Sequence, residues 1–280
     1  MDRRDELTKA KGNDMATTGA GKNDWLAAWA VASYTLREAL RNRILWIALV
    51  FSVMGVGLAG FIGDVAVTEE REVKVILLAA AYRYCAALTL MVLVISTLVR
   101  EFNDKCLELY LSLTISRLMY FVGKMAGFFM AGGMLAAVFG AALLLYADAA
   151  PVLLWTATLA CELAIVAAVG VFCVMSFNQQ IPASFAAALV FYLMCRAADG
   201  IVLISQSEII LHTTGVYVMK FLVESLAFVL PSLARFARSD WLAYGGVDFA
   251  AALSPVALQT AIYVLLIGAA AMIDFSRKNI

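Results

Sequence analysis

Long apolar runs separated by short polar segments are the dominant pattern along this 280-residue chain. Each run holds about 20 mostly apolar residues, which lets one helix cross roughly 30 Å of hydrocarbon. Hydrophobic residues make up 64% of the chain and charged residues 15%, so the composition excludes an ordinary soluble domain. The pattern predicts an all-α, polytopic (multi-pass) membrane protein whose six transmembrane helices lie near 44–62, 76–99, 119–147, 152–177, 183–205 and 256–273.

The chain before the first apolar run divides into a polar tail and an amphipathic helix. Residues 1–23 are polar, charged and Gly-rich, which predicts a disordered cytoplasmic tail without a secretory signal. Residues 24–43 carry apolar side chains at helical spacing, namely Trp25, Trp29, Ala32, Leu36 and Leu40. The Trp and Arg content favours a helix lying in the membrane interface, and a helix packed on the protein itself is the alternative.

Lysine and arginine near the span ends predict the orientation. One side carries Arg37, Arg41, Arg43, Arg100, Lys105, Arg117, Lys124, Arg277 and Lys278. The other side carries Arg71, Lys74, Arg235 and Arg238. We therefore expect the richer side, with both termini, to be cytoplasmic, and an even number of spans agrees with this.

The connector 206–255, on the outer side, is long and partly apolar. Its apolar stretch 214–230 is short, carries Lys220 and Glu224 at i,i+4 spacing, and ends at Pro231. Segments of this length are more often re-entrant than spanning. We predict short outer re-entrant helices here, because a seventh span would move the C-terminus to the outer side.

Four ionisable residues, Arg83, Glu162, Arg196 and Asp199, fall inside the predicted spans. Charged groups in hydrocarbon are costly, so these side chains should face protein or water and be paired. One interpretation is a substrate path or a proton- or cation-sensitive gate. The other is structural: Arg83 neutralises Glu162, and Arg196 neutralises Asp199 at i,i+3, so that both pairs hold helices together.

Small residues at four-residue spacing indicate helix surfaces that pack closely. Gly123 and Gly127 are four apart, and Gly132, Ala136 and Gly140 repeat this spacing along the third span. We expect contacts within the molecule, with a dimer contact as the alternative.

The residue types that catalysis or metal binding requires are scarce. Five cysteines form no CxxC pair and His212 is the single histidine, so we expect no metal site on this chain. No span offers a nucleophile beside a base, which argues against an intramembrane enzyme. The formal net charge of zero argues against nucleic acid as a partner.

A charged amphipathic segment, 100–124, lies between the second and third apolar runs. Phe102, Cys106, Leu109 and Leu113 share roughly one helical face, whereas the charged residues occupy others. A short helix here would rest on the inner membrane surface and present charges to a partner. An interfacial loop without a partner is the alternative.

The amino-acid sequence of this segment resembles a family signature. Residues 107–117 read LELYLSLTISR and are followed by Gly123-Lys124, which is similar to the run T-L-E-x-L-L-S-x-P-I-S-R…G-K of type-2 ABC exporter permeases. The chain looks most like the copper-enzyme-maturation branch, which includes the nitrous-oxide-reductase maturation permease. Lys105-Cys106 stands where that family usually has Gly-Thr, and Thr114 where it often has Pro.

The resemblance implies that 100–118 is a coupling helix docking in a groove of a separate nucleotide-binding ATPase subunit. That partner would hold the ATP and Mg, since this chain has no GxxxxGK[ST] sequence and no cofactor of its own. The candidates for coupling are Glu101, Leu107, Glu108, Leu111, Ser112, Arg117 and Lys124.

The same resemblance implies the permease subunit of an exporter in the bacterial inner membrane. A second copy or a related permease would complete the transporter, with an accessory protein possible on the periplasmic side. The alternative is a scaffolding membrane protein for copper-enzyme assembly without bulk transport.

Overall fold

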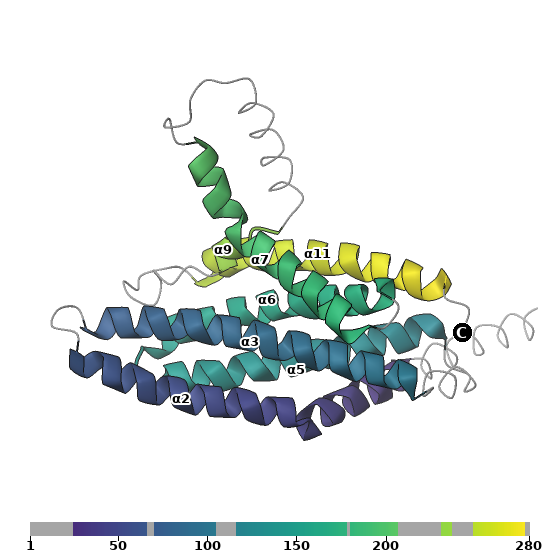
Figure 1. The fold of residues 1–280 in the computed structure, drawn as a ribbon, viewed down its shortest axis with the longest axis horizontal. Coiled ribbons are helices and arrows are strands. Elements are labelled where there is room, and N and C mark those ends of the chain that lie inside the picture. Colours follow the sequence, from purple (N-terminus) through teal and green to yellow (C-terminus); the bar gives the residue numbers. More distant parts are fainter. Residues whose placement is uncertain are drawn as a thin grey trace, which may run out of the picture.

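The computed structural model describes residues 25–65, 70–104, 116–177, 180–206, 231–236 and 249–277, and these residues form helices and no strand. The helices are the N-terminal helix Trp25–Arg41, α2 (Arg43–Val65), α3 (Glu70–Asn103), α5 (Arg117–Leu143), α6 (Ala149–Ser176), α7 (Ile181–Gln206), α9 (Leu233–Phe236) and α11 (Phe249–Arg277) (Figure 1).

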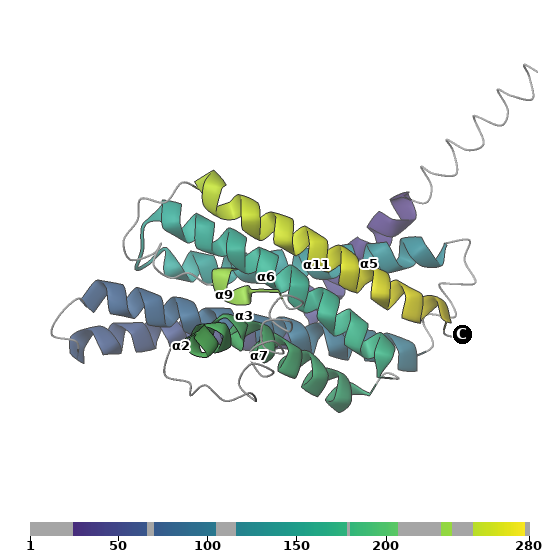
Figure 2. The same cartoon turned by 90° about the horizontal axis from the view of Figure 1, so that it is seen from above.

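Helix α6 is the centre of the bundle. It packs against α3, α5, α7 and α11, and Figure 2 shows α11 lying along it. In its most apolar stretch 78% of α6 is buried, against 17% for α11. The α11 helix therefore turns most of its apolar surface outward, as a helix facing lipid or another chain would.

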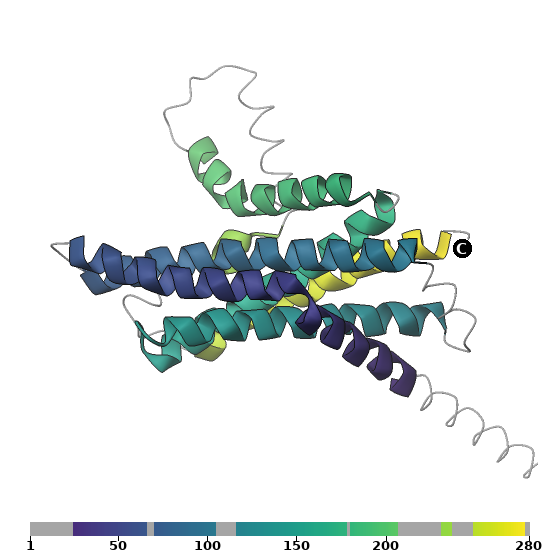
Figure 3. The ribbon, with the colours of Figure 1, turned by 60° about the horizontal axis from the view of Figure 1, so that its bottom comes forward.

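Five helices in the described part of the chain are long and apolar enough to cross a membrane. They are α3, α5, α6, α7 and α11, and the N-terminal helix with α2 makes a sixth if this bent pair is counted as one span. The two helices of the pair meet at an angle of 57°, a bend that Figure 3 shows clearly. The chain is thus an all-α, multi-pass membrane protein.

The N-terminal helix packs along α5 through small residues. A Cβ on Gly123 would lie 2.5 Å from the carbonyl oxygen of Ala28, and one on Gly127 would lie 2.6 Å from the Cβ of Thr35. The predicted packing of these glycines within the molecule is therefore confirmed. The predicted apolar stripe is divided, because small Ala32 is buried whereas Trp29 is 64% exposed. Close approach to the glycines selects the small side chains, which leaves the large ones outside.

The observed helix ends show where the predicted segments lie in the bundle. The end of α3, the start of α5 and the C-terminal end of α11 lie together at one end of the bundle (Figures 1 and 3). The predicted outer connector was wrong at its C-terminal boundary, because α11 already begins at Phe249 and includes Pro255. Pro255 lies in the second turn of α11, where it has no N–H to donate to the carbonyl of Ala251, and the hydroxyl of Ser254 donates to that carbonyl at 3.5 Å. The Ala-rich residues before the proline favour helix.

Candidate functional site

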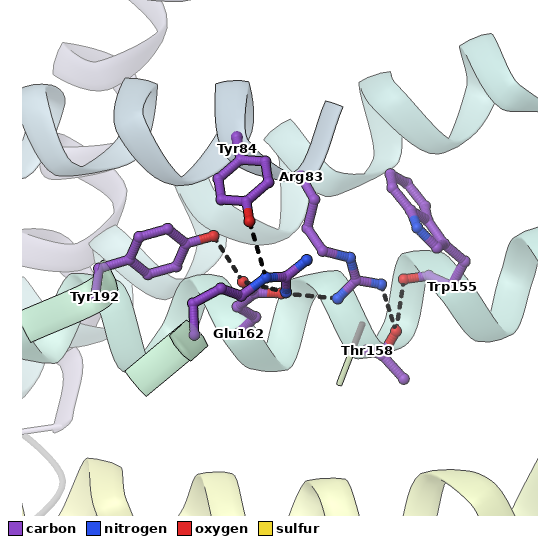
Figure 4. Close-up of polar contacts among 7 residues, drawn as sticks. Arg83, Tyr84, Trp155, Thr158, Glu162 and Tyr192 are labelled. Carbon is purple, nitrogen blue, oxygen red and sulfur yellow. Dashed lines mark hydrogen bonds and ion pairs between the residues drawn. The ribbon is translucent and has the colours of Figure 1, made fainter. Parts of the chain in front are cut away.

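Glu162 of α6 is the centre of a buried polar cluster that joins three helices (Figure 4). The Nη1 of Arg83 in α3 donates to its Oε2 at 2.7 Å, and the two side chains are only 2% and 0% exposed. The Nη2 of Arg83 donates to Thr158 Oγ1 at 3.2 Å. Thr158 and Glu162 are four residues apart, so both side chains leave α6 on one face. The Arg83–Glu162 pairing of the structural interpretation is confirmed.

The second carboxylate oxygen of Glu162 faces α7. The hydroxyl of Tyr192 donates to Oε1 at 2.9 Å, and Nη1 of Arg196 lies 3.7 Å from the same oxygen. Arg196 also donates through Nε to the hydroxyl of Tyr84 in α3 at 3.3 Å. The sequence paired Arg196 with Asp199, whose side chain lies outside the described residues. The described partner of Arg196 is instead on another span.

Aromatic rings flank both guanidinium groups. The guanidinium of Arg83 lies 5.3 Å from the ring centre of Trp155, and that of Arg196 lies 5.1 Å from Tyr84. Cation–π contacts of this kind stabilise a partly desolvated cation. Two guanidinium groups surround one carboxylate among these residues, so each charge has an opposite charge or a ring beside it.

This cluster joins three helices through buried polar contacts. Its carboxylate is engaged on both oxygens, by Arg83 and by Tyr192. Removing one partner of a buried ion pair typically costs about 3–5 kcal/mol. The Glu162 cluster therefore connects α3, α6 and α7.

A second buried cluster lies where α3 ends and α5 begins. Lys124 of α5 forms a hydrogen-bonded ion pair with Oε1 of Glu101 in α3, and Tyr120 donates to Oε2 of Glu101 at 3.0 Å. Glu38 of the N-terminal helix adds a second carboxylate, 3.9 Å from Lys124. Three helices thus meet through one lysine.

Glu38 occupies the least satisfied position of this cluster. Its Oε2 is buried and makes no hydrogen bond. Burial raises the pKa of the Glu38 carboxyl, the positive charge of Lys124 opposes this rise, and the negative charge of Glu101 adds to it. Ionised Glu38 is therefore disfavoured here relative to the same group in water.

The predicted coupling residues fall into three groups: two lie in the second cluster, one is exposed at the start of α5, and the others lie outside the described residues. Glu101 and Lys124 are only 7% and 3% exposed. Unlike charges on the surface, they are therefore not available for direct contact with a partner. Arg117 is exposed as the first residue of α5, which is capped by the Ser116 hydroxyl accepting from the Met119 amide. Residues outside the described part are Leu107, Glu108, Leu111, Ser112, Lys220 and Glu224.

The sequence pointed to the charged members of both clusters except Glu38, and it missed their polar neighbours. Tyr120, Thr158 and Tyr192 each precede a charged cluster member by four residues. Polar residues four apart in an apolar helix share one face, so this spacing was the sequence signal that these residues contact the charged cluster members. Within the described ranges, no three His, Cys, Asp or Glu side chains lie close enough together to hold a metal ion.

No family model and no curated protein matches the chain. A functional assignment therefore depends on the resemblance of individual residues and on the geometry of the two clusters.

Proposed function

We propose that this chain is the permease subunit of an ATP-driven ABC transporter that works as an exporter. Its partner is a separate nucleotide-binding ATPase subunit that binds the segment between α3 and α5. The amino-acid sequence of that segment, LELYLSLTISR, supports the proposal. The contacts that join the two flanking helices support it as well.

The joining of α3 to α5 is the observation that carries this proposal. Glu101 is in the last turn of α3 and Lys124 is in the second turn of α5, and their buried ion pair ties the two helix ends together. The hydroxyl of Tyr120 on the same carboxylate adds a second link. A push on the intervening residues would reach both helices at once, as a coupling element requires.

The Glu162 cluster extends this connection across the bundle. Arg83 belongs to α3, so a displacement of α3 acts on Glu162 of α6 through a 2.7 Å contact. Glu162 in turn contacts Tyr192 and Arg196 of α7. Contiguous chains of packed side chains, hydrogen bonds and ion pairs of this kind can carry coupling between distant parts of a protein.

The proposed assembly contains two permease subunits and two ATPase subunits in a bacterial inner membrane. A homodimer is the default from the symmetry of most oligomers. ATP and Mg belong to the ATPase, and this chain supplies no catalytic group. Work could be done on a transported molecule or on an outer-side protein during metalloenzyme assembly.

Purification of the tagged full chain in mild detergent tests the proposal. We expect an ATPase with a P-loop to co-purify, and Glu108→Arg to abolish its binding while leaving the permease in the membrane. Arg277→Glu is the matched control, because it reverses an exposed charge in the last turn of α11, outside the segment.

Two results would count against the transporter. One is recovery of the intact chain without any ATPase, in detergent and again in lipid discs. The other is loss of the ATPase in both variants, which would indicate a general charge effect. The first result would favour the scaffolding alternative.

A further inference from the structure

A second candidate site lies at the bend between the N-terminal helix and α2. A hollow of about 1080 Å³ opens there, between these two helices and the last turns of α3. Four arginines line it, and we refer to it as the arginine hollow: Arg37, Arg41, Arg43 and Arg100. Polar side chains of Asn42 and Ser96 also line it.

The arginine hollow carries an excess of positive charge. Among the described residues, Arg37, Arg41 and Arg43 form no ion pair. Arg100 reaches only Asp104, at 3.7 Å, and both side chains are largely exposed. The one lining carboxylate, Glu38, is turned towards buried Lys124. Guanidinium groups left without carboxylates are suited to bind phosphate, which they can contact through two parallel hydrogen bonds.

A separate apolar groove of about 200 Å³ shares a lining residue with the hollow. Leu40 lines both spaces, and the groove then follows α2 and the middle of α5. Its other lining residues are Leu45, Trp46, Ala48, Leu49, Met134, Leu135 and Val138. Trp46 lines this groove and is 67% exposed, and tryptophan is enriched at membrane interfaces. A positive hollow beside an apolar groove matches a molecule with a phosphate at one end and a hydrocarbon chain at the other.

We propose that the arginine hollow and the apolar groove bind one anionic phospholipid of the cytoplasmic leaflet. The phosphate lies among the arginines, and one acyl chain lies in the groove between α2 and α5. Anionic lipids are concentrated in that leaflet, where they are attracted to basic residues near the membrane surface. The bound lipid fills the angle of the 57° bend and so supports the junction of the two helices.

Lipid retention by the purified full chain tests this inference. Native mass spectrometry would compare phosphatidylglycerol with phosphatidylcholine carrying the same acyl chains. We expect preferential retention of phosphatidylglycerol, weakened about tenfold or more in Arg41→Gln/Arg43→Gln, because each basic residue contributes about 1 kcal/mol. Arg277→Gln, at an exposed arginine of α11, should retain the lipid like the unaltered chain.

Two further arms separate a lipid from a free anion. Val138→Trp fills the apolar groove and should weaken phosphatidylglycerol retention while leaving the arginines unchanged. Inorganic phosphate should not reproduce the thermal stabilisation that phosphatidylglycerol gives. Equal retention of both lipids, an equal loss in Arg277→Gln, or the same arginine-dependent stabilisation by inorganic phosphate would each overturn the proposal.

Discussion

Glu162 is the residue on which Arg83, Tyr192 and Arg196 converge. Its two oxygens receive Arg83 from one side and Tyr192 from the other, and its own side chain is fully buried. A carboxylate at such depth is stable only with its partners in place. The cost of removing one partner is therefore larger than the net gain from the intact pair.

We expect Glu162→Gln to lower the free energy of unfolding by about 3–5 kcal/mol, since it leaves two buried guanidinium groups without their carboxylate. Asp104→Asn is the control: it removes an exposed i,i+4 pair with Arg100 and should cost less than about 1 kcal/mol. Unfolding by denaturant or heat in detergent measures both.

The double variant Arg83→Met/Glu162→Met sharpens this test. Because it removes both charges of the closest pair, it should be less destabilising than the sum of the two single changes. Strict additivity would show that the 2.7 Å ion pair contributes nothing to stability.

At the scale of elements, the contact between the N-terminal helix and α5 depends on glycine. A Cβ on Gly127 would lie 2.6 Å from the Cβ of Thr35, whereas a Cβ on Gly133 of the same helix would have no neighbour within 4 Å. This pair of glycines offers the same substitution in a crowded and in an open position.

Gly127→Ala should destabilise the chain by about 1–3 kcal/mol, because the added methyl group forces the N-terminal helix away from α5. Gly133→Ala should be neutral or slightly stabilising, since alanine favours helix over glycine. Thermal unfolding of the two variants side by side is the measurement. Equal melting temperatures would mean that the two helices are not held by this contact.

Helix α2 is attached to the bundle in a different way. The hydroxyl of Tyr82 in α3 donates to the carbonyl of Ser52 at 2.7 Å, and that of Tyr146 donates to the carbonyl of Val56 at 2.8 Å. These bonds use the backbone of α2, and Gly55 leaves room for the Tyr82 ring, because a Cβ at position 55 would lie 2.5 Å from the Cε1 atom of Tyr82. Apolar side chains of α2 also point outward and can face lipid. Val53, for example, is 65% exposed.

The orientation of the whole molecule decides how both proposals operate. The α3–α5 connection, the arginine hollow and the C-terminal end of α11 must share the cytoplasmic side if an ATPase and an anionic inner-leaflet lipid are to reach them. The lysine and arginine distribution predicts this orientation, with an even number of spans.

Reporter fusions to the C-terminus test the orientation. A green fluorescent protein, which folds in the cytoplasm, should be bright, and an alkaline phosphatase, which needs the periplasm, should be inactive. Fusions placed after Leu144, in the turn between α5 and α6, should behave in the opposite way. An active phosphatase at the C-terminus would mean an odd number of spans, because either the bent pair with α2 does not cross the membrane or a further crossing lies within 207–248.

The local sequence determined the all-helical architecture, the approximate spans and the close packing of the third span. Apolar run length sets how far a helix extends in lipid, and four-residue spacing of glycine sets where another helix can approach. The sequence also pointed to Arg83 and Glu162 as partners, because a buried charge needs an opposite one and few are available.

Only the tertiary structure decided how the helices are rotated and which polar groups meet. Nearly uniform apolar helices give no clear periodicity, so the sequence did not show that Arg196 faces Glu162 or that Glu101 and Lys124 are buried together. Nor did it show that four arginines surround one hollow, since they come from two neighbouring helices and from α3, far along the chain. Contacts between such distant segments arise from packing in three dimensions, which local residue patterns do not encode.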